Sequence, residues 1–133
     1  MKVVTGGRYN GKLEYVTEEL GFSGSEILDL GNTDIAEALS VMKDHPVLYH
    51  LEAFIKKAIP KEIDFNAVIE SYVQARPDCV IVCDEVGSGI VPVKREDDEW
   101  REAVGRIMCR LACKAGGITR ITYGVAEEIR YGI

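Results

Sequence analysis

MKVVTGGRYNGKL, residues 1–13, joins a short apolar run to a glycine-rich loop that ends in a lysine. Residues 1–5 predict a buried strand, and residues 6–12 have the spacing G-x-x-x-x-G-K of a phosphate-binding loop. In such a loop the backbone N–H groups point at phosphate oxygens, and the lysine adds a compact positive charge. A strand followed directly by this loop predicts an α/β fold that binds a nucleotide.

The loop departs from the motif at Leu13, where Ser or Thr normally supplies a hydroxyl to Mg²⁺. Leucine has no ligand oxygen, so we expect phosphates, waters and a carboxylate to hold the metal instead. The alternative is a plain glycine turn with an exposed lysine. The predicted nucleotide-binding residues are Gly6, Gly7, Arg8, Tyr9, Asn10, Gly11, Lys12 and Leu13.

A second loop, CDEVGSGIVP (residues 83–92), follows an apolar run that predicts another buried strand. Polar loops at the ends of parallel strands are where open α/β sheets build their sites. We expect Glu85 to act as a catalytic acid or base or as a Mg²⁺ ligand, with Asp84 behind it. The alternative is that the Glu85 carboxylate only binds loop amides. Gly87 and Gly89 would let the backbone approach a substrate.

Composition indicates a globular protein in aqueous surroundings. The 133 residues suffice for a single domain, residues 1–133, with 47% hydrophobic and 29% charged residues. The net charge of -6 disfavours a surface for nucleic acid. Apolar runs fall short of the roughly 20 residues that span a bilayer, and the N-terminus lacks the pattern of a signal peptide, so we expect a cytoplasmic protein.

The four cysteines form two pairs with C-x-x-x-C spacing, Cys79 with Cys83 and Cys109 with Cys113. The first pair falls on one face of a predicted strand, and the second pair on successive turns of a predicted helix. This spacing is not that of a zinc ribbon, so we interpret the cysteines as small apolar residues in a reducing interior. A metal site built on them is the less favoured alternative.

The apolar residues predict strands and helices in alternation. Helical spacing is clearest in residues 95–115, where Trp100, Ile107 and Leu111 belong to one stripe. Pro46 is placed to open another helix. The expected strands are residues 1–5, 25–30, 79–83 and 118–123, and the expected helices are residues 12–20, 33–42, 46–59, 64–75 and 95–115. This order predicts an α/β fold, a mainly parallel sheet with helices on both faces and a terminal segment at one edge.

Three arginines, Arg95, Arg101 and Arg106, lie along the longest predicted helix. Arg95 and Arg106 are separated by close to three helical turns, so they share a side and could receive a phosphate. The alternative is a solvated helix face on which each arginine pairs with Glu99 or Glu102.

The chain has two histidines, His45 and His50. His50 falls beside Leu51 and Phe54 on the apolar side of the helix expected to begin at Pro46. This placement favours a hydrogen-bonded histidine in the core. A nucleophilic or general-base role for His50 is the alternative, because imidazole exchanges protons near neutral pH.

The second loop and the helix after it resemble the C-terminal half of adenosylcobinamide kinase/adenosylcobinamide-phosphate guanylyltransferase. The run E-V-G-x-G-I-V-P of residues 85–92 carries most of this resemblance, and T-G-G-x-x-x-G-K of residues 5–12 resembles the family's phosphate loop. The resemblance covers residues 1–20 and the chain from Cys79 onward. Further matching residues are Arg95, Arg101, Gly105, Arg106, Ala112 and Gly124.

The resemblance implies a P-loop α/β fold and a role in cobalamin assembly. Enzymes of this family transfer a phosphoryl group from GTP or ATP to the aminopropanol hydroxyl of adenosylcobinamide. They then transfer GMP from GTP to that phosphate through a guanylylated histidine. A nucleoside triphosphate and a corrinoid as binding partners, Mg²⁺ as a cofactor, and a homo-oligomer are implied as well.

The same resemblance implies roles for particular residues. Lys12 and its loop would hold phosphates, and Glu85 with Asp29 would organise Mg²⁺ or accept the hydroxyl proton. The predicted catalytic residues are Lys12, Glu85 and His50, the predicted metal ligands are Glu85 and Asp29, and the predicted substrate-binding residues are Gly87, Gly89, Arg95, Arg101 and Arg106.

The chain departs from the family pattern at three places. Leu13 replaces the hydroxyl residue, Asp98 stands where the family has an arginine, and the segment between the two loops is shorter. The missing part should hold the guanylylated histidine, so His45 or His50 would be a relic of it. Three interpretations therefore stay open. They are a cobinamide kinase, a catalytically impaired nucleotide- or corrinoid-binding regulator or partner protein, and a kinase of another small alcohol.

Overall fold

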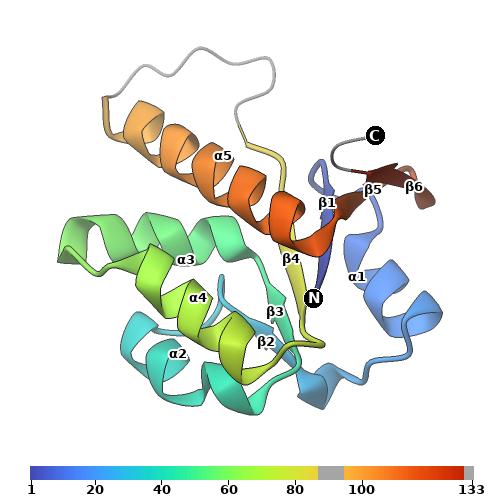
Figure 1. The fold of residues 1–133 in the computed structure, drawn as a ribbon, viewed down its shortest axis with the longest axis horizontal. Helices are drawn as coiled ribbons and strands as arrows, with labels where there is room; N and C mark the ends of the chain where they lie inside the picture. The colour runs from blue at the N-terminus through green and yellow to red at the C-terminus, as the bar shows by residue number, and fades with distance from the viewer. Residues whose placement is uncertain (87–94, 131–133) are drawn as a thin grey trace.

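The computed structural model describes residues 1–86 and 95–130, with the backbone only for Arg95 and Glu96. These residues build a six-stranded sheet in the order β2-β3-β4-β1-β5-β6, with helices packed against it (Figure 1). The strands from β2 to β5 in this order are parallel, and β6 runs antiparallel to β5 at the edge. The strands are β1 (Lys2–Gly6), β2 (Ile27–Asp29), β3 (Val47–Tyr49), β4 (Val80–Asp84), β5 (Gly117–Thr122) and β6 (Val125–Arg130).

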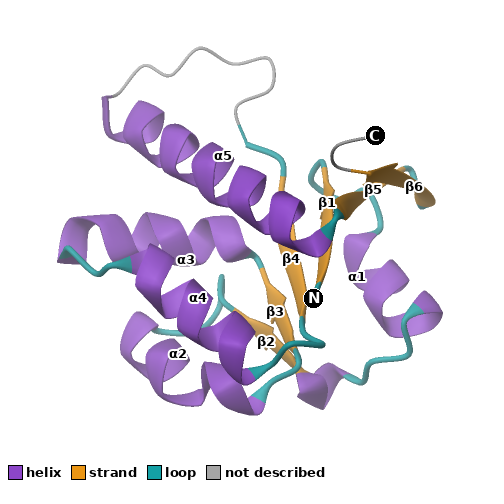
Figure 2. Ribbon diagram, in the orientation of Figure 1, coloured by secondary structure: helices purple, strands orange, loops and turns teal. Residues whose placement is uncertain are grey.

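The helices connect these strands in the way that a mainly parallel sheet requires (Figure 2). The helices are α1 (Lys12–Glu14, continued by a π-helical turn Tyr15–Glu19), α2 (Ile35–Val41), α3 (Leu51–Ala58), α4 (Phe65–Ala75) and α5 (Arg95–Ala115). Among the described residues, none of these helices is long and apolar enough to cross a membrane. The predicted α/β fold is therefore confirmed.

The two faces of the sheet are covered unequally. Val3 and Ile81 point to one face and pack in a core cluster with residues of α2, α3, α4 and α5. Val4 and Val82, the next residue in each strand, point to the opposite face and pack with Val16 of the helical segment that follows the first loop. Helices on both faces are confirmed, but the second face carries much less helix than the first.

The segment before α3 differs from the sequence prediction. Residues 47–49 form the short strand β3 between β2 and β4, and the helix begins only at Leu51. His50 joins them with a left-handed backbone, φ 64°. The expectation of one helix from Pro46 was wrong. Val47 has a spacing to Leu51 and Phe54 that fits a helix, but this spacing does not show whether Val47 itself lies in a helix or in a strand. His50 is consequently not a core residue of a helix face.

Other boundaries agree with the sequence prediction within a few residues. α5 spans Arg95–Ala115 as expected, and Asp64 caps α4, since its Oδ1 accepts a hydrogen bond of 3.1 Å from the Ala67 backbone N–H. The terminal segment pairs at the sheet edge as β6. All four cysteines are free thiols. Cys79 and Cys83, just before and within β4, are buried, whereas Cys109 and Cys113 are exposed on α5.

Candidate functional site

The ends of three parallel strands place polar side chains on the sheet face that the first loop overlies. Asp29, Tyr49 and Asp84 are the last residues of β2, β3 and β4. The residues two positions earlier are Ile27, Val47 and Val82. Val47 and Val82 belong to the core cluster under the α1 segment, and Ile27 packs against it. Side chains alternate along a strand, so all three strand ends lie toward that face. The register pairs Gly6, where the loop begins, with Asp84.

Two glycines fix the shape of the first loop. At Gly6, φ is 157° and a Cβ atom would lie 2.4 Å from the backbone oxygen of Ile121. At Gly11, φ is 95° and a Cβ atom would lie 3.2 Å from Cα of Gly124. The backbone N–H of Gly124 donates to the Asn10 oxygen at 2.9 Å, so the turn between β5 and β6 supports the loop. Larger residues at the glycine positions would open this packing.

Lys12 is buried, with 3% of its surface exposed. Its Nζ lies 2.9 Å from Oδ1 of Asp84 and donates to the backbone oxygen of Gly7 at 2.6 Å. The alternative of a glycine turn with an exposed lysine is therefore wrong. The ammonium group is held between the loop backbone and Asp84.

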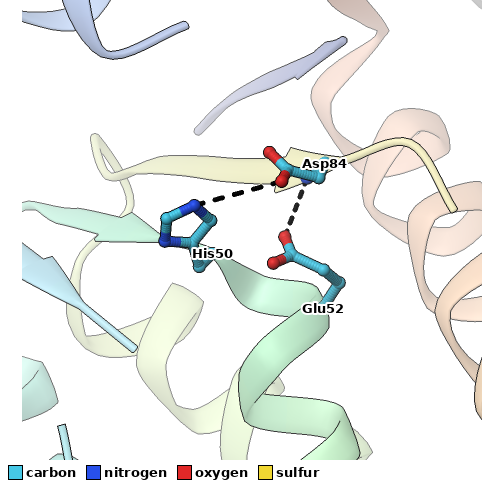
Figure 3. A group of neighbouring side chains, drawn as sticks. All are labelled: His50, Glu52 and Asp84. Carbon is cyan, nitrogen blue, oxygen red and sulfur yellow. Dashed lines mark hydrogen bonds and ion pairs between the residues drawn. The ribbon is translucent and has the colours of Figure 1, made fainter. Parts of the chain in front are cut away.

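His50 lies between two carboxylates. Its Nδ1 is 2.8 Å from Oδ1 of Asp29. Its Nε2 is 4.0 Å from Oδ2 of Asp84, the contact drawn in Figure 3. Asp29 is itself fixed, since it accepts hydrogen bonds of 2.9 Å from the Gly31 N–H and from Nδ2 of Asn32. With Nδ1 turned to Asp29, Nε2 is the ring nitrogen that faces Asp84.

Glu52, in the first turn of α3, brings a further carboxylate to this place. Its side chain points toward Asp84 in Figure 3, and Oε1 accepts a 2.8 Å hydrogen bond from the Asp84 N–H. Burial raises the pKa of Glu52 above its usual value, and the Asp84 charge raises it further. Trp100 of α5 donates from Nε1 to the Glu52 backbone oxygen at 2.8 Å. Burial and the nearby carboxylates also raise the pKa of Tyr49 to about 12.

Two adjoining cavities share Arg8, His50 and Asp84 in their linings. The first, of about 440 Å³, follows the loop from Arg8 to Glu14 and is also lined by Tyr49. We call it the loop cavity. The second, of about 630 Å³, lies between α3 and α5 and we call it the helix cavity. The remaining residues that line the helix cavity are Gly31, Asn32, Glu52, Ala53, Lys56, Glu85, Val86, Trp100 and Arg101.

Glu85 does not join the carboxylates around His50. Its Oε1 and Oε2 accept hydrogen bonds of 2.6 and 3.0 Å from Arg120 of β5. The two predicted metal ligands, Glu85 and Asp29, are thus each held by other partners. The cluster that offers metal-binding atoms within 4.8 Å of one another is His50, Glu52 and Asp84, among the residues that the structure describes.

The predicted substrate-binding residues are only partly brought together. Arg101 lines the helix cavity. Arg106 pairs with Glu102 on the exposed side of α5 and lines a separate cavity against α4. This is the local ion pair that the alternative interpretation expected. Gly87, Gly89 and the Arg95 side chain fall outside the described residues.

Sequence reasoning did not place Glu52, Tyr49 or Trp100 at the candidate site, and it placed Asp84 second to Glu85. Strand alternation was the signal available for Asp84. Val80, Val82 and Asp84 are every second residue of one strand, so their side chains point to the same face of the sheet. For Tyr49 and Glu52 the signal depended on recognising β3, which the helical spacing concealed.

Comparisons with known proteins identify the family of the chain. The sequence model of the family described as cobinamide kinase / cobinamide phosphate guanyltransferase matches residues 36–129. The bifunctional adenosylcobalamin biosynthesis protein CobU of Escherichia coli (strain K12) is 35% identical over 69 residues. That match covers 49% of this chain but 38% of the length of the relative. The match to the family model includes the second loop but not the first, and it confirms the family resemblance. The chain belongs to the cobinamide kinase / cobinamide phosphate guanyltransferase family.

Proposed function

We propose that the chain transfers a phosphoryl group from GTP or ATP to the hydroxyl of a cobinamide-like corrinoid. The observation that carries this proposal is the position of Lys12 and Asp84. They form a buried ion pair, and Asp84 lines both cavities. A donor in one cavity and an acceptor in the other would meet at this pair.

The loop cavity suits the phosphates of the donor. The backbone of residues 6–11 and the Lys12 ammonium would surround the phosphate oxygens, and the phosphates would compete with Asp84 for the lysine. In the transfer, the acceptor oxygen would bond to the γ-phosphorus and release its proton to water, while the bond to the β–γ bridging oxygen breaks and the nucleoside diphosphate leaves. Mg²⁺ bound with the nucleotide would neutralise phosphate charge, and Asp84 would be its carboxylate ligand.

The helix cavity suits a larger acceptor. It is the more voluminous of the two and combines an aromatic face, Trp100, with the cations of Lys56 and Arg101. Lys56 Nζ lies 4.7 Å from the centre of the Trp100 ring. The apolar wall would pack against one face of the corrin ring. The two positive groups would bind the phosphate that the reaction adds.

We infer that the chain does not perform the GMP-transfer step. His50 is the histidine that lines the cavities, whereas Nδ1 of His45 contacts the Val41 backbone oxygen at 3.0 Å. Oδ2 of Asp84 faces Nε2 of His50 at 4.0 Å, so an α-phosphate would reach this nitrogen only by displacing that carboxylate, whereas the γ-phosphate would meet the Lys12 ammonium on the other oxygen of Asp84.

A second candidate is a nucleotide- or corrinoid-binding regulator or partner protein without turnover. Leu13 favours it, because this side chain lines the loop cavity and brings no hydroxyl to a metal. Leu13→Ser tests the difference, with Leu13→Ala as the control that also lacks the bulk of leucine. An enzyme limited by its metal ligand gains turnover in Leu13→Ser alone, whereas a binding protein gains none in either variant.

Mass spectrometry of adenosylcobinamide, incubated with the protein, Mg²⁺ and GTP or ATP, tests the proposal directly. We expect a gain of one phosphate on the corrinoid and no gain on an unrelated small alcohol. Phosphorylation of the alcohol instead would identify a different kinase. A gain of phosphate plus GMP would refute the inference about the second step. An unchanged corrinoid, beside an active full-length enzyme in parallel, would favour the binding protein.

A further inference from the structure

The cluster around His50 contains more acidic side chains than lysines. Three carboxylates, those of Asp29, Glu52 and Asp84, meet one ammonium, that of Lys12, around a single imidazole. Glu52 is only 8% exposed. Burying a carboxylate without a matching cation costs several kcal/mol. The cluster is therefore an environment in which a bound cation is stabilised.

The atoms that could bind such a cation converge. His50, Glu52 and Asp84 each offer one nitrogen or oxygen atom, and these atoms lie within 4.8 Å of one another. His50 joins β3 to α3, Glu52 lies in the first turn of α3, and Asp84 ends β4 (Figure 3). Ligand atoms at about 2.0–2.2 Å from a small divalent ion lie roughly 3 Å apart, so modest side-chain rotations would complete the site.

A second layer of contacts already orients these ligands. The Asp29 carboxylate faces Nδ1 of His50, which leaves Nε2 as the coordinating nitrogen. This carboxylate–histidine arrangement is typical of metal sites. Lys12 occupies Oδ1 of Asp84, which leaves Oδ2 on the side of the His50 ring.

We propose that His50, Glu52 and Asp84 bind a divalent first-row transition-metal ion, such as Mn²⁺, in the absence of nucleotide. One imidazole with two carboxylates favours such an ion over Mg²⁺, which prefers oxygen ligands alone. The remaining coordination positions open toward the helix cavity and the loop cavity, which both border His50 and Asp84. The site does not depend on phosphoryl transfer, so it stands whichever function of the chain is correct.

Titration of the full chain with Mn²⁺ alone, without nucleotide, tests the proposal. Mn²⁺ is preferred to Zn²⁺ as a probe, because the exposed thiols of Cys109 and Cys113 would bind zinc. Trp100 is the sole tryptophan and contacts the Glu52 backbone, so its fluorescence reports paramagnetic quenching at the cluster. We expect one Mn²⁺ per chain, with Mg²⁺ competing only at concentrations at least about tenfold higher.

Two variants probe the ligands. His50→Asn keeps a residue type that tolerates a left-handed backbone, and Glu52→Gln keeps the acceptor for the Asp84 N–H. We expect each to weaken Mn²⁺ binding at least about tenfold. Pulsed electron paramagnetic resonance should detect an imidazole nitrogen coupled to Mn²⁺ that disappears in His50→Asn. His45→Asn and Glu37→Gln, each altered away from the cluster, should bind Mn²⁺ like the unaltered chain.

The proposal is overturned if Mn²⁺ binding survives both His50→Asn and Glu52→Gln, or if Mn²⁺ binds no more tightly than Mg²⁺. Binding that appears only after a nucleotide is added also overturns it, and leaves the proposed phosphoryl transfer intact. Conversely, tight Mn²⁺ binding with no phosphorylation of adenosylcobinamide supports the metal site and refutes the proposed function.

Discussion

Glu52 is a carboxylate that the fold places where little water reaches it. Burial and the Asp84 charge raise its pKa in the folded protein. The folded state therefore binds the Glu52 proton more tightly than the unfolded chain does, and stability falls as pH rises from the unfolded pKa, 4.5, through the raised pKa. At neutral pH, without a bound cation, this residue opposes folding.

Glu52→Gln should consequently stabilise the protein in EDTA at pH 7, by about 1 kcal/mol. The amide keeps the hydrogen bond to the Asp84 N–H and removes the buried charge. Urea unfolding at pH 7 and at pH 4 measures the effect, which should shrink at pH 4, where the unaltered Glu52 gains its proton. Glu37→Gln, on the exposed side of α2, is the matched control. A Glu52→Gln protein that is less stable at pH 7 would contradict this account.

Neighbouring acidic residues illustrate what sequence alone can decide at this scale. Both Asp84 and Glu85 follow the same apolar run, and either could have served the site. Asp84 is still part of the sheet, where it pairs with Gly6. Its side chain points to the same face as those of Val80 and Val82, and its carboxylate contacts Lys12 there. Glu85 binds Arg120, a pairing that depends on β5 lying beside β1. That order of strands is a property of the whole sheet and is not encoded in the local residues.

At the scale of the elements, backbone packing constrains β1 and its loop. A Cβ on Gly6 would overlap the Ile121 oxygen of β5, the strand paired with β1. Gly6→Ala should therefore destabilise the fold by about 2 kcal/mol or more and weaken nucleotide binding. Gly24→Ala is the control, because nothing lies within 4 Å of its added Cβ. It should leave the unfolding midpoint in urea unchanged or slightly higher. Equal midpoints for both variants would show that the loop adapts.

Long elements could be predicted from the sequence, and β3 could not. α5 repeats its apolar stripe over several turns, which no strand could imitate. β3 has three residues, and its stability comes from pairing with β2 and β4 on either side. A segment this short has no period of its own. Because β3 was missed, the left-handed turn at His50 and the approach of Glu52 to Asp84 were missed with it.

On the scale of the whole molecule, unequal coverage of the sheet explains where the cavities lie. α3 and α5 stand against the same face and enclose the helix cavity between them. The opposite face carries the short helical segment after Lys12, and the loop cavity lies along it. The strand ends of β2, β3 and β4 lie where the two faces meet, which puts the charged cluster between the two cavities.

If the two cavities hold different ligands, damage to each should affect one ligand alone. Lys12→Ala removes a charged contact to phosphate and should weaken nucleotide binding about 10- to 100-fold, with corrinoid binding little changed.

Trp100→Phe removes the hydrogen bond to the Glu52 oxygen and loosens the wall of the helix cavity. It should weaken adenosylcobinamide binding about 2- to 10-fold and leave nucleotide binding intact. Calorimetry with each ligand measures both effects, with Lys61→Ala, an exposed lysine outside both linings, as the control. Two variants that weaken both ligands equally would mean that donor and acceptor share one cavity, and the division of roles between the loop and the α3–α5 wall would be wrong.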